Sequence, residues 1–190
     1  MTDDISLFLI GAFIAFAIVY GIRRFAGFPA QEPQDYAHLV PSIDLRENLR
    51  GTLLCRGMIF GPTGRVTSRF EAVMRMTWDG DSGSIKEDFL YDDGTRQSRS
   101  WHLTVLEDGW IRAEASDVIG TARGRQCGNA FGMRYRIVLP PENGGHTLDA
   151  VDWMYLQPDG TILNRSQFRK FGIKVAELFA TITPMEDDDA

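Results

Sequence analysis

The sequence predicts an all-β protein: an antiparallel up-and-down, lipocalin-like barrel preceded by one N-terminal transmembrane helix. Three observations lead to this prediction. The first 26 residues contain an uncharged run, Ile5–Ile22, which is the most apolar stretch of the chain. Beyond residue 50, turn signals recur at short intervals, and the segments between them alternate apolar and polar residues. Both patterns are typical of half-buried strands joined by hairpins.

The apolar run has the length of a membrane span. Its 18 residues would form a helix about 27 Å long, close to the hydrocarbon thickness of about 30 Å. We therefore expect residues 1–26 to be a retained membrane anchor. A cleaved signal peptide is the main alternative, but such a peptide begins with basic residues, whereas Asp3 and Asp4 precede this run. A buried helix of a soluble protein is the other alternative.

The charges around the run predict its orientation. Arg23 and Arg24 follow it, and positive residues near a span usually stay in the cytoplasm. We expect a single-pass protein whose soluble body faces the cytoplasm, with a periplasmic placement as the alternative. The two cysteines, Cys55 and Cys127, show no metal-binding spacing and do not decide the compartment.

Residues 27–50 are predicted to form a linker that contains a short helix. Three prolines between Gly27 and Pro41 favour an extended chain. Ser42 could cap a helix over residues 42–49, which Gly51 would end. At the other end of the chain, residues 185–190 are predicted to be an acidic, solvated tail.

The turn signals divide residues 51–184, the predicted barrel domain, into eight to ten strands. Asp-Gly and Asn-Gly pairs supply the positive φ angle of tight hairpins. Short connections without helices indicate an antiparallel meander, and closing such a sheet into a barrel removes its exposed edges. A two-sheet sandwich is the alternative. The turn signals are Gly61–Gly64, Asp79-Gly80, Asp92–Gly94, Glu107–Gly109, Asn143–Gly145 and Pro158–Gly160.

Alternation within the strands predicts which side chains face the interior. Along Val66–Trp78 nearly every second residue is apolar, so this segment is predicted to be a half-buried strand. The same reasoning applied to the later strands gives a predicted core. Its main members are Phe70, Met74, Trp78, Phe89, Trp101, Met133, Tyr135 and Met154.

Polar and charged residues share the apolar face of several strands. Around the Asp92–Gly94 turn, Glu87 falls opposite Arg99, so a carboxylate and a guanidinium would face each other inside. Buried charges must be paired or hydrated, because burying them alone costs several kcal/mol. Two interpretations stay open: an internal network that holds the barrel together, or a polar pocket for a ligand. The candidate ligand-binding residues are Glu87, Arg99, Trp101, Asn129, Asp152 and Asn164.

Arg99 is the residue we expect to recognise the polar end of a lipid. Its planar guanidinium can receive a carboxylate or a phosphate in place of Glu87. The chain of that lipid would lie against the aromatic lining, with Asn129, Asp152 and Asn164 close to Arg99.

Several segments of the body resemble a bacterial family catalogued as domain of unknown function 3833. The resemblance implies a small envelope protein without an assigned activity. Many relatives look like lipoproteins, and similar proteins tend to be encoded beside lipid-modifying enzymes, which favours a lipid-related role. This chain has no cysteine before Cys55, so its apolar helix takes the place of an acylated cysteine. The matching segments are Phe60–Val66, Glu87–Gly94, Arg99–Trp101, Asp117–Gly124, Gly128–Ala130, Asp152–Leu156, Asn164-Arg165 and Lys170–Gly172.

The predicted function is that of a barrel tethered to the bacterial inner membrane that binds a lipid or another apolar small molecule. Its partners would be the lipid bilayer and that ligand. The net charge of −6 argues against nucleic acid as a partner. No cofactor or metal is expected, because His38, His102 and His146 are scattered along the chain.

Two alternatives belong to other functional classes. A lipid-modifying isomerase or hydrolase would use Asp152 or Glu87 as its base and Arg99 as an electrostatic partner, with Asp117 as a third carboxylate. We expect no catalytic residues, because the common nucleophile and nucleotide-binding motifs are absent from the sequence. The other alternative is a structural module whose barrel is packed solid, and the interior volume distinguishes it from a binding protein.

Overall fold

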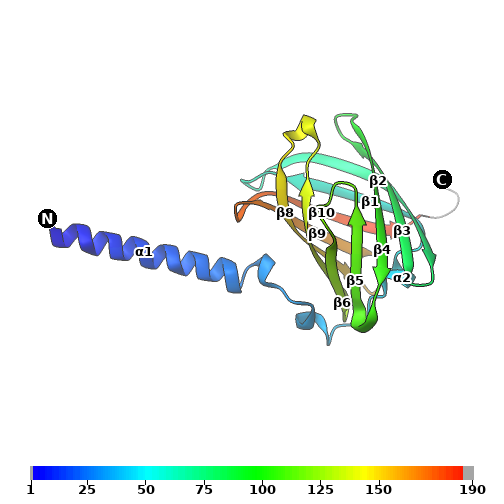
Figure 1. Cartoon of the computed structure of the whole chain (residues 1–190), viewed down its shortest axis with the longest axis horizontal. Helices are drawn as coiled ribbons and strands as arrows, with labels where there is room; N and C mark the ends of the chain where they lie inside the picture. The colour runs from blue at the N-terminus through cyan, green and yellow to red at the C-terminus, as the bar shows by residue number, and fades with distance from the viewer. Residues whose placement is uncertain (1, 186–190) are drawn as a thin grey trace. The chain divides into compact units, whose positions relative to one another are not determined.

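The computed structural model describes residues 2–185, so all of the expected acidic tail except Met185 lies outside the described residues. The chain divides into two compact units, Met1–Glu32 and Pro33–Ala190. The first unit contains α1 (Thr2–Phe25), blue in Figure 1, and the short η1 (Phe28–Ala30). Among the described residues, α1 is the one helix long and apolar enough to cross a membrane, with a mean hydropathy of 2.5 over Ile5–Ile22.

The second unit is a closed antiparallel barrel of ten strands (Figure 1). Each strand pairs with its neighbours in sequence, and β1 pairs with β10 to close the barrel. This topology confirms the predicted up-and-down barrel and excludes the two-sheet sandwich. The strands are β1 (Gly51–Phe60), β2 (Val66–Asp79), β3 (Ser82–Tyr91), β4 (Arg96–Val105), β5 (Trp110–Ala115), β6 (Ala122–Cys127), β7 (Ala130–Val138), β8 (Thr147–Leu156), β9 (Ile162–Lys170) and β10 (Ile173–Pro184). The short helices are η2 (Pro33–Tyr36), α2 (Leu45–Asn48), η3 (Glu107–Gly109) and η4 (Pro141–Asn143).

The predicted turn signals account for most of the hairpins. Gly80 and Gly94 have φ angles of 57° and 85°, the left-handed conformation that glycine adopts without strain. The hairpin around Gly94 places Glu87 directly opposite Arg99, as the sequence predicts. The predicted turn signals do not include the connections that follow β5, β6 and β9. The ten strands lie at the upper end of the predicted range of eight to ten.

The segment before β1 closes one end of the barrel. Its helix α2 is capped by Asp44 and not by Ser42, because the Asp44 side chain accepts a hydrogen bond from the first turn. Leu45 and Leu49 are at most 1% exposed and line the barrel interior. The Trp78 indole N–H donates to the Leu49 carbonyl at 2.8 Å, which fixes the end of α2 to β2.

Residues before α2 pack along the outside of the barrel. The Tyr36 ring lies 5.2 Å from the Trp153 ring and 5.4 Å from the Tyr155 ring, measured between centroids. Trp153 points outward from β8, yet it is only 2% exposed. Gly132 makes room for it, since a Cβ there would lie 2.7 Å from the indole. The expected linker over residues 27–50 therefore packs with the barrel from residue 33 onward.

The predicted core is found inside the barrel. Phe70, Met74, Trp101, Met133 and Tyr135 are each at most 9% exposed. The other three predicted members, Trp78, Phe89 and Met154, are half-buried and pack against this core.

Candidate functional site

A cavity of about 110 Å³ lies inside the barrel. Most side chains around it are aliphatic, aromatic or methionine, and α2 forms one end. Engineered apolar cavities of about 150 Å³ bind benzene, whereas pockets for drug-sized ligands measure roughly 300–1,000 Å³. The interior is therefore not packed solid, and its present volume is below that of a cavity that binds benzene.

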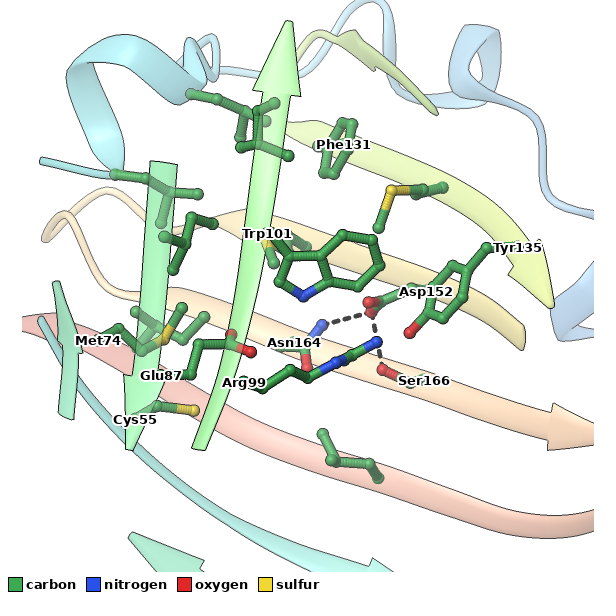
Figure 2. A pocket seen from close by; sticks show the side chains of 18 of the residues that line it. Cys55, Met74, Glu87, Arg99, Trp101, Phe131, Tyr135, Asp152, Asn164 and Ser166 are labelled. Carbon is green, nitrogen blue, oxygen red and sulfur yellow. Dashed lines mark hydrogen bonds between the residues drawn. The ribbon is translucent and has the colours of Figure 1, made fainter. Parts of the chain in front are cut away.

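One part of the cavity wall is polar. In Figure 2, Glu87, Arg99 and Asp152 point toward the same region, beside the Trp101 ring. These side chains come from β3, β4 and β8, so the barrel brings together residues far apart in the sequence. The polar members that line the cavity are Glu87, Arg99, Tyr135, Asp152, Asn164 and Ser166.

Arg99 forms an ion pair with Asp117, from the connection after β5. Arg99 Nε lies 2.8 Å from Asp117 Oδ2, and Nη2 donates a hydrogen bond to Oδ1 at 3.1 Å. The two side chains are 16% and 23% exposed, so solvent screens the pair only weakly. The Arg99 guanidinium carbon also lies 4.4 Å from the centre of the Trp101 ring, in a cation–π contact. Asp117 therefore takes the charge-pairing role that the sequence assigned to Glu87.

Glu87 is buried beside this pair. It is 9% exposed, and its Oε2 has no hydrogen-bond partner among the described residues. Burial raises the pKa of Glu87 to about 7, although the nearby Arg99 acts to lower it. Near neutral pH this carboxyl group therefore exists in both its ionised and its protonated form.

Asp152 is held in place by two hydrogen bonds. Its Oδ1 accepts from Asn164 Nδ2 at 2.6 Å and from Ser166 Oγ at 2.7 Å, the dashed lines of Figure 2. Asn164 also donates to the Trp153 carbonyl at 3.1 Å. Burial raises the pKa of Asp152, and the hydrogen bonds from Ser166 and Asn164 act in the opposite direction.

Tyr135 and Cys55 are the remaining titratable side chains that line the cavity. Burial raises the pKa of the Tyr135 phenol and raises the pKa of the Cys55 thiol to about 12, so both stay neutral at physiological pH. Cys55 and Cys127 are both free thiols. Within the described part of the chain, no group of three or more His, Cys, Asp or Glu side chains is placed to hold a metal ion.

The structure brings five of the six predicted ligand-binding residues to the cavity: Glu87, Arg99, Trp101, Asp152 and Asn164. Asn129 is the exception, which corrects the expectation that it faces inward. It lies in the turn after β6, where Gly128 has a φ angle of 54°, and its carbonyl accepts from the Leu156 N–H at 2.8 Å. The alternating pattern of β7 was extended backward through a turn, where it no longer applies.

The sequence prediction did not include Ser166 in the site, and it named Asp117 only as a third carboxylate and not as the partner of Arg99. Ser166 carried a usable signal, because it shares the alternation of Asn164 along β9. Nothing in the sequence indicated that Asp117 would pair with Arg99, because Asp117 lies in a connection where alternation does not predict the direction of a side chain.

Sequence comparison places this barrel in a family. The family model described as "Protein of unknown function (DUF3833)" matches residues 22–184, which is most of the chain. The chain belongs to the DUF3833 family. Among curated proteins, none matches the sequence.

Two solved structures resemble the DUF3833 barrel. The S-type phycobiliprotein lyase CPES from Guillardia theta aligns with a TM-score of 0.55 at 8% identity, covering 83% of this chain and 99% of that chain. Rv2717c from M. tuberculosis aligns with a TM-score of 0.54 at 15% identity, covering 78% of this chain and 99% of that chain. At these identities the likeness supports a lipocalin-like barrel fold and carries no function.

Proposed function

We propose that this DUF3833 protein is a membrane-tethered barrel that binds a lipid or another apolar small molecule in its interior. The observation that carries the proposal is the cavity, which combines an apolar lining with one small polar cluster. That combination is typical of small-molecule sites, where apolar walls supply affinity and a few polar groups fix orientation. A purely structural barrel would fill this space with side chains.

The small volume of the interior favours a slender ligand such as a single acyl chain over a bulky one. Away from α2, the half-buried Phe89 and Phe168 lie beside the cavity, where a chain would enter. Three methionines also line it, and methionine adapts easily to irregular occupants. These are Met74, Met133 and Met154. Movement of such side chains would enlarge the cavity for a longer chain.

The test of binding is mass spectrometry of small molecules that co-purify with the full-length protein. Cys55→Phe places a large ring in the cavity and should remove the co-purifying ligand. Leu54→Phe places the same ring at the neighbouring position of β1, which faces the opposite side of the strand, and should retain the ligand. Circular dichroism establishes that both variants keep the barrel. Equal ligand content in the two variants would contradict binding in the cavity.

The proposed tether is α1, inserted in the inner membrane as a single span. Its apolar run Ile5–Ile22 and the following Arg23 and Arg24 favour a barrel on the cytoplasmic face. We expect the full-length chain to resist carbonate extraction with its N-terminus intact, whereas a shortened N-terminus would identify a signal sequence. A reporter fused after Ala190 should be active in the cytoplasm, and activity in the periplasm would reverse the orientation.

A lipid-modifying activity is the second candidate, and Glu87 is the observation that favours it. A buried carboxyl group with a pKa of about 7 beside a guanidinium is suited to general acid–base catalysis. Lipid extract incubated with the full-length protein should then yield a product that Glu87→Gln does not form. Recovery of all lipids unchanged would leave binding as the function.

A further inference from the structure

The residues lining the cavity include more acids than bases. Among the described residues, Arg99 is the single cation that lines it, whereas Glu87 and Asp152 both do. Asp117 adds a third carboxylate through its ion pair with Arg99. An anionic ligand would therefore add negative charge to a buried region that holds three carboxyl groups and one positive charge, and like charges in such a region repel strongly.

One side of the guanidinium is also already paired with a carboxylate, although its Nε forms an ion-pair contact and no hydrogen bond. Asp117 approaches both its Nε and its Nη2, at 2.8 Å and 3.1 Å, and Trp101 covers one face at 4.4 Å. A carboxylate or phosphate would have to displace Asp117 to gain the side-on contact through Nε and Nη2, and an end-on contact through Nη1 and Nη2 would place a further negative charge beside Asp117. Such an exchange would leave Asp117 without its charge partner, so the net gain from binding an anion is small.

Glu87 offers the cavity a hydrogen-bond acceptor that is not in use. This side chain is more than nine-tenths buried, lines the cavity, and has one oxygen, Oε2, without a hydrogen-bond partner among the described residues. In contrast, Asp152 Oδ1 already accepts two hydrogen bonds. A buried carboxyl oxygen without a partner is costly, so a ligand that supplies a donor to Glu87 would relieve that cost.

We propose that the ligand, whose binding in the barrel is the function proposed above, presents a hydrogen-bond donor to Glu87 and not a carboxylate or a phosphate. The donor is a hydroxyl or an ammonium group at the end of an apolar chain. Both groups can donate to the free oxygen of Glu87, and both avoid adding negative charge beside Asp117 and Asp152. Arg99 and Asp117 then act as a fixed pair that positions the carboxyl group of Glu87 and the Trp101 ring.

The titration of Glu87 supports this assignment, because its pKa of about 7 keeps part of the carboxyl group ionised at neutral pH. An ionised Glu87 attracts an ammonium group more strongly than a protonated one, so ammonium binding should tighten as the pH rises through 7. A hydroxyl group carries no charge and should show a weaker dependence. The titratable groups that shift the pKa of Glu87 are Arg99 on β4, which lowers it, and Asp117 after β5 and Asp152 on β8, which raise it. Glu87 in turn raises the pKa values of three neighbouring groups, which are Cys55 on β1, Tyr91 on β3 and Tyr135 on β7.

Three probes with the same eight-carbon chain test the proposal: 1-octanol, octylamine and octanoate. Each is titrated into full-length protein in phospholipid nanodiscs, and binding is followed by NMR of the methionine methyl groups. Met74, Met133 and Met154 line the cavity and report on its occupant, while Met58 on the outer side of β1 serves as an internal reference. We expect octanol or octylamine to bind at least about tenfold more tightly than octanoate, a difference of one decade in Kd.

The outcomes separate this inference from the proposed function. Octanoate binding as tightly as the other two probes, or more tightly, would overturn the donor assignment while leaving an apolar site in the barrel. No response of the cavity methionines to any probe would overturn the proposed function itself. The tighter of octanol and octylamine identifies whether the donor is a hydroxyl or an ammonium group.

Variants and pH then assign the preference to Glu87. Octylamine binding should tighten about tenfold from pH 6 to pH 8 in the wild type, as Glu87 ionises. In Glu87→Gln this pH dependence should disappear and the discrimination against octanoate should shrink. Asp88→Asn, which removes the adjacent carboxylate on the outer face, should behave like the wild type. The same pH dependence in Glu87→Gln and wild type would contradict Glu87 as the partner.

Discussion

Glu87 and Asp88 are neighbours on β3, yet they face opposite sides of the barrel and their pKa values move in opposite directions. Inside, burial raises the pKa of Glu87 to about 7. Outside, a hydrogen bond from Ser98 lowers the pKa of Asp88, and the nearby Arg75 adds to that effect. The two carboxyl groups have the same chemistry and a nearly identical backbone position. The difference between their pKa values shows that burial in the barrel interior disfavours the ionised form of a carboxyl group.

The ion pairs of the two faces repeat this contrast. Arg75 and Asp88 approach to 2.8 Å on the outer face, where their side chains are 57% and 56% exposed. Arg99 and Asp117 also approach to 2.8 Å, but their side chains are 16% and 23% exposed. Exposed pairs contribute little to stability, whereas buried pairs lose their hydration and depend on their partners. An interior cluster that costs stability is more easily explained by ligand binding than by structural support.

Removing one cation from each face should give the largest difference in stability between the interior and the outer face. Arg99→Met leaves Glu87, Asp117 and Asp152 without a positive partner, and we expect it to lower the free energy of unfolding by about 3–5 kcal/mol at neutral pH. Arg75→Met on the outer face should produce no measurable change. Urea unfolding of the full-length protein, followed by tryptophan fluorescence, measures both. Equal effects of the two substitutions would mean that the interior is as well solvated as the surface.

The pH dependence of stability should differ in sign between the two faces. Glu87 binds its proton more tightly in the folded state, so the wild type should lose stability as the pH rises from about 4.5 to about 7. The loss is on the order of 3 kcal/mol, and Glu87→Gln should remove it. Asp88 has a lowered pKa, so its contribution is present above its ordinary value of 3.8 and disappears as the pH falls.

Unfolding curves at several pH values test this difference. Asp88→Asn should remove the loss of stability that the wild type shows as the pH falls below about 3.8, and it should leave the fall between pH 4.5 and 7 in place. If Glu87→Gln shows the same fall as the wild type, Glu87 is not the group responsible for it.

Removing one serine hydroxyl from each face should give the smallest of the three differences in stability. Ser166 donates to Asp152 at 2.7 Å inside the barrel, and Ser98 donates to Asp88 at 2.8 Å outside. Ser166→Ala leaves a buried carboxylate with one donor fewer and should cost about 1–3 kcal/mol. Ser98→Ala should cost much less, because water replaces the lost donor. A larger effect for Ser98 than for Ser166 would contradict the assignment of faces.

Regular alternation made the interior cluster largely predictable. The Asp92–Gly94 turn and the two-residue period of β3 and β4 were enough to place Glu87 opposite Arg99 inside the barrel. The sequence also indicated the closed meander, because Asp-Gly turns recur with short spacing. The sequence indicated poorly the connections after β5 and β6, which contain Asp117 and Asn129.

The features that escaped prediction depend on contacts between distant segments. Asp117 reaches Arg99 from a connection with no periodic pattern, so its direction could not be derived. Trp153 belongs to the outward face of β8 and is buried only because Tyr36, far away in the sequence, packs over it. Alternation predicts the face of a strand, but it does not predict which segment will cover that face.

The most direct test of the central claim is NMR titration of the Glu87 side-chain carboxyl group in full-length protein, with and without saturating 1-octanol. The Glu87→Gln variant identifies the signal. We predict a midpoint near pH 7 in the free protein, because Glu87 is buried. Octanol should move this midpoint to lower pH, since a hydroxyl donor stabilises the ionised carboxylate. A midpoint close to the ordinary value of 4.5 that octanol does not change would contradict a ligand site at Glu87.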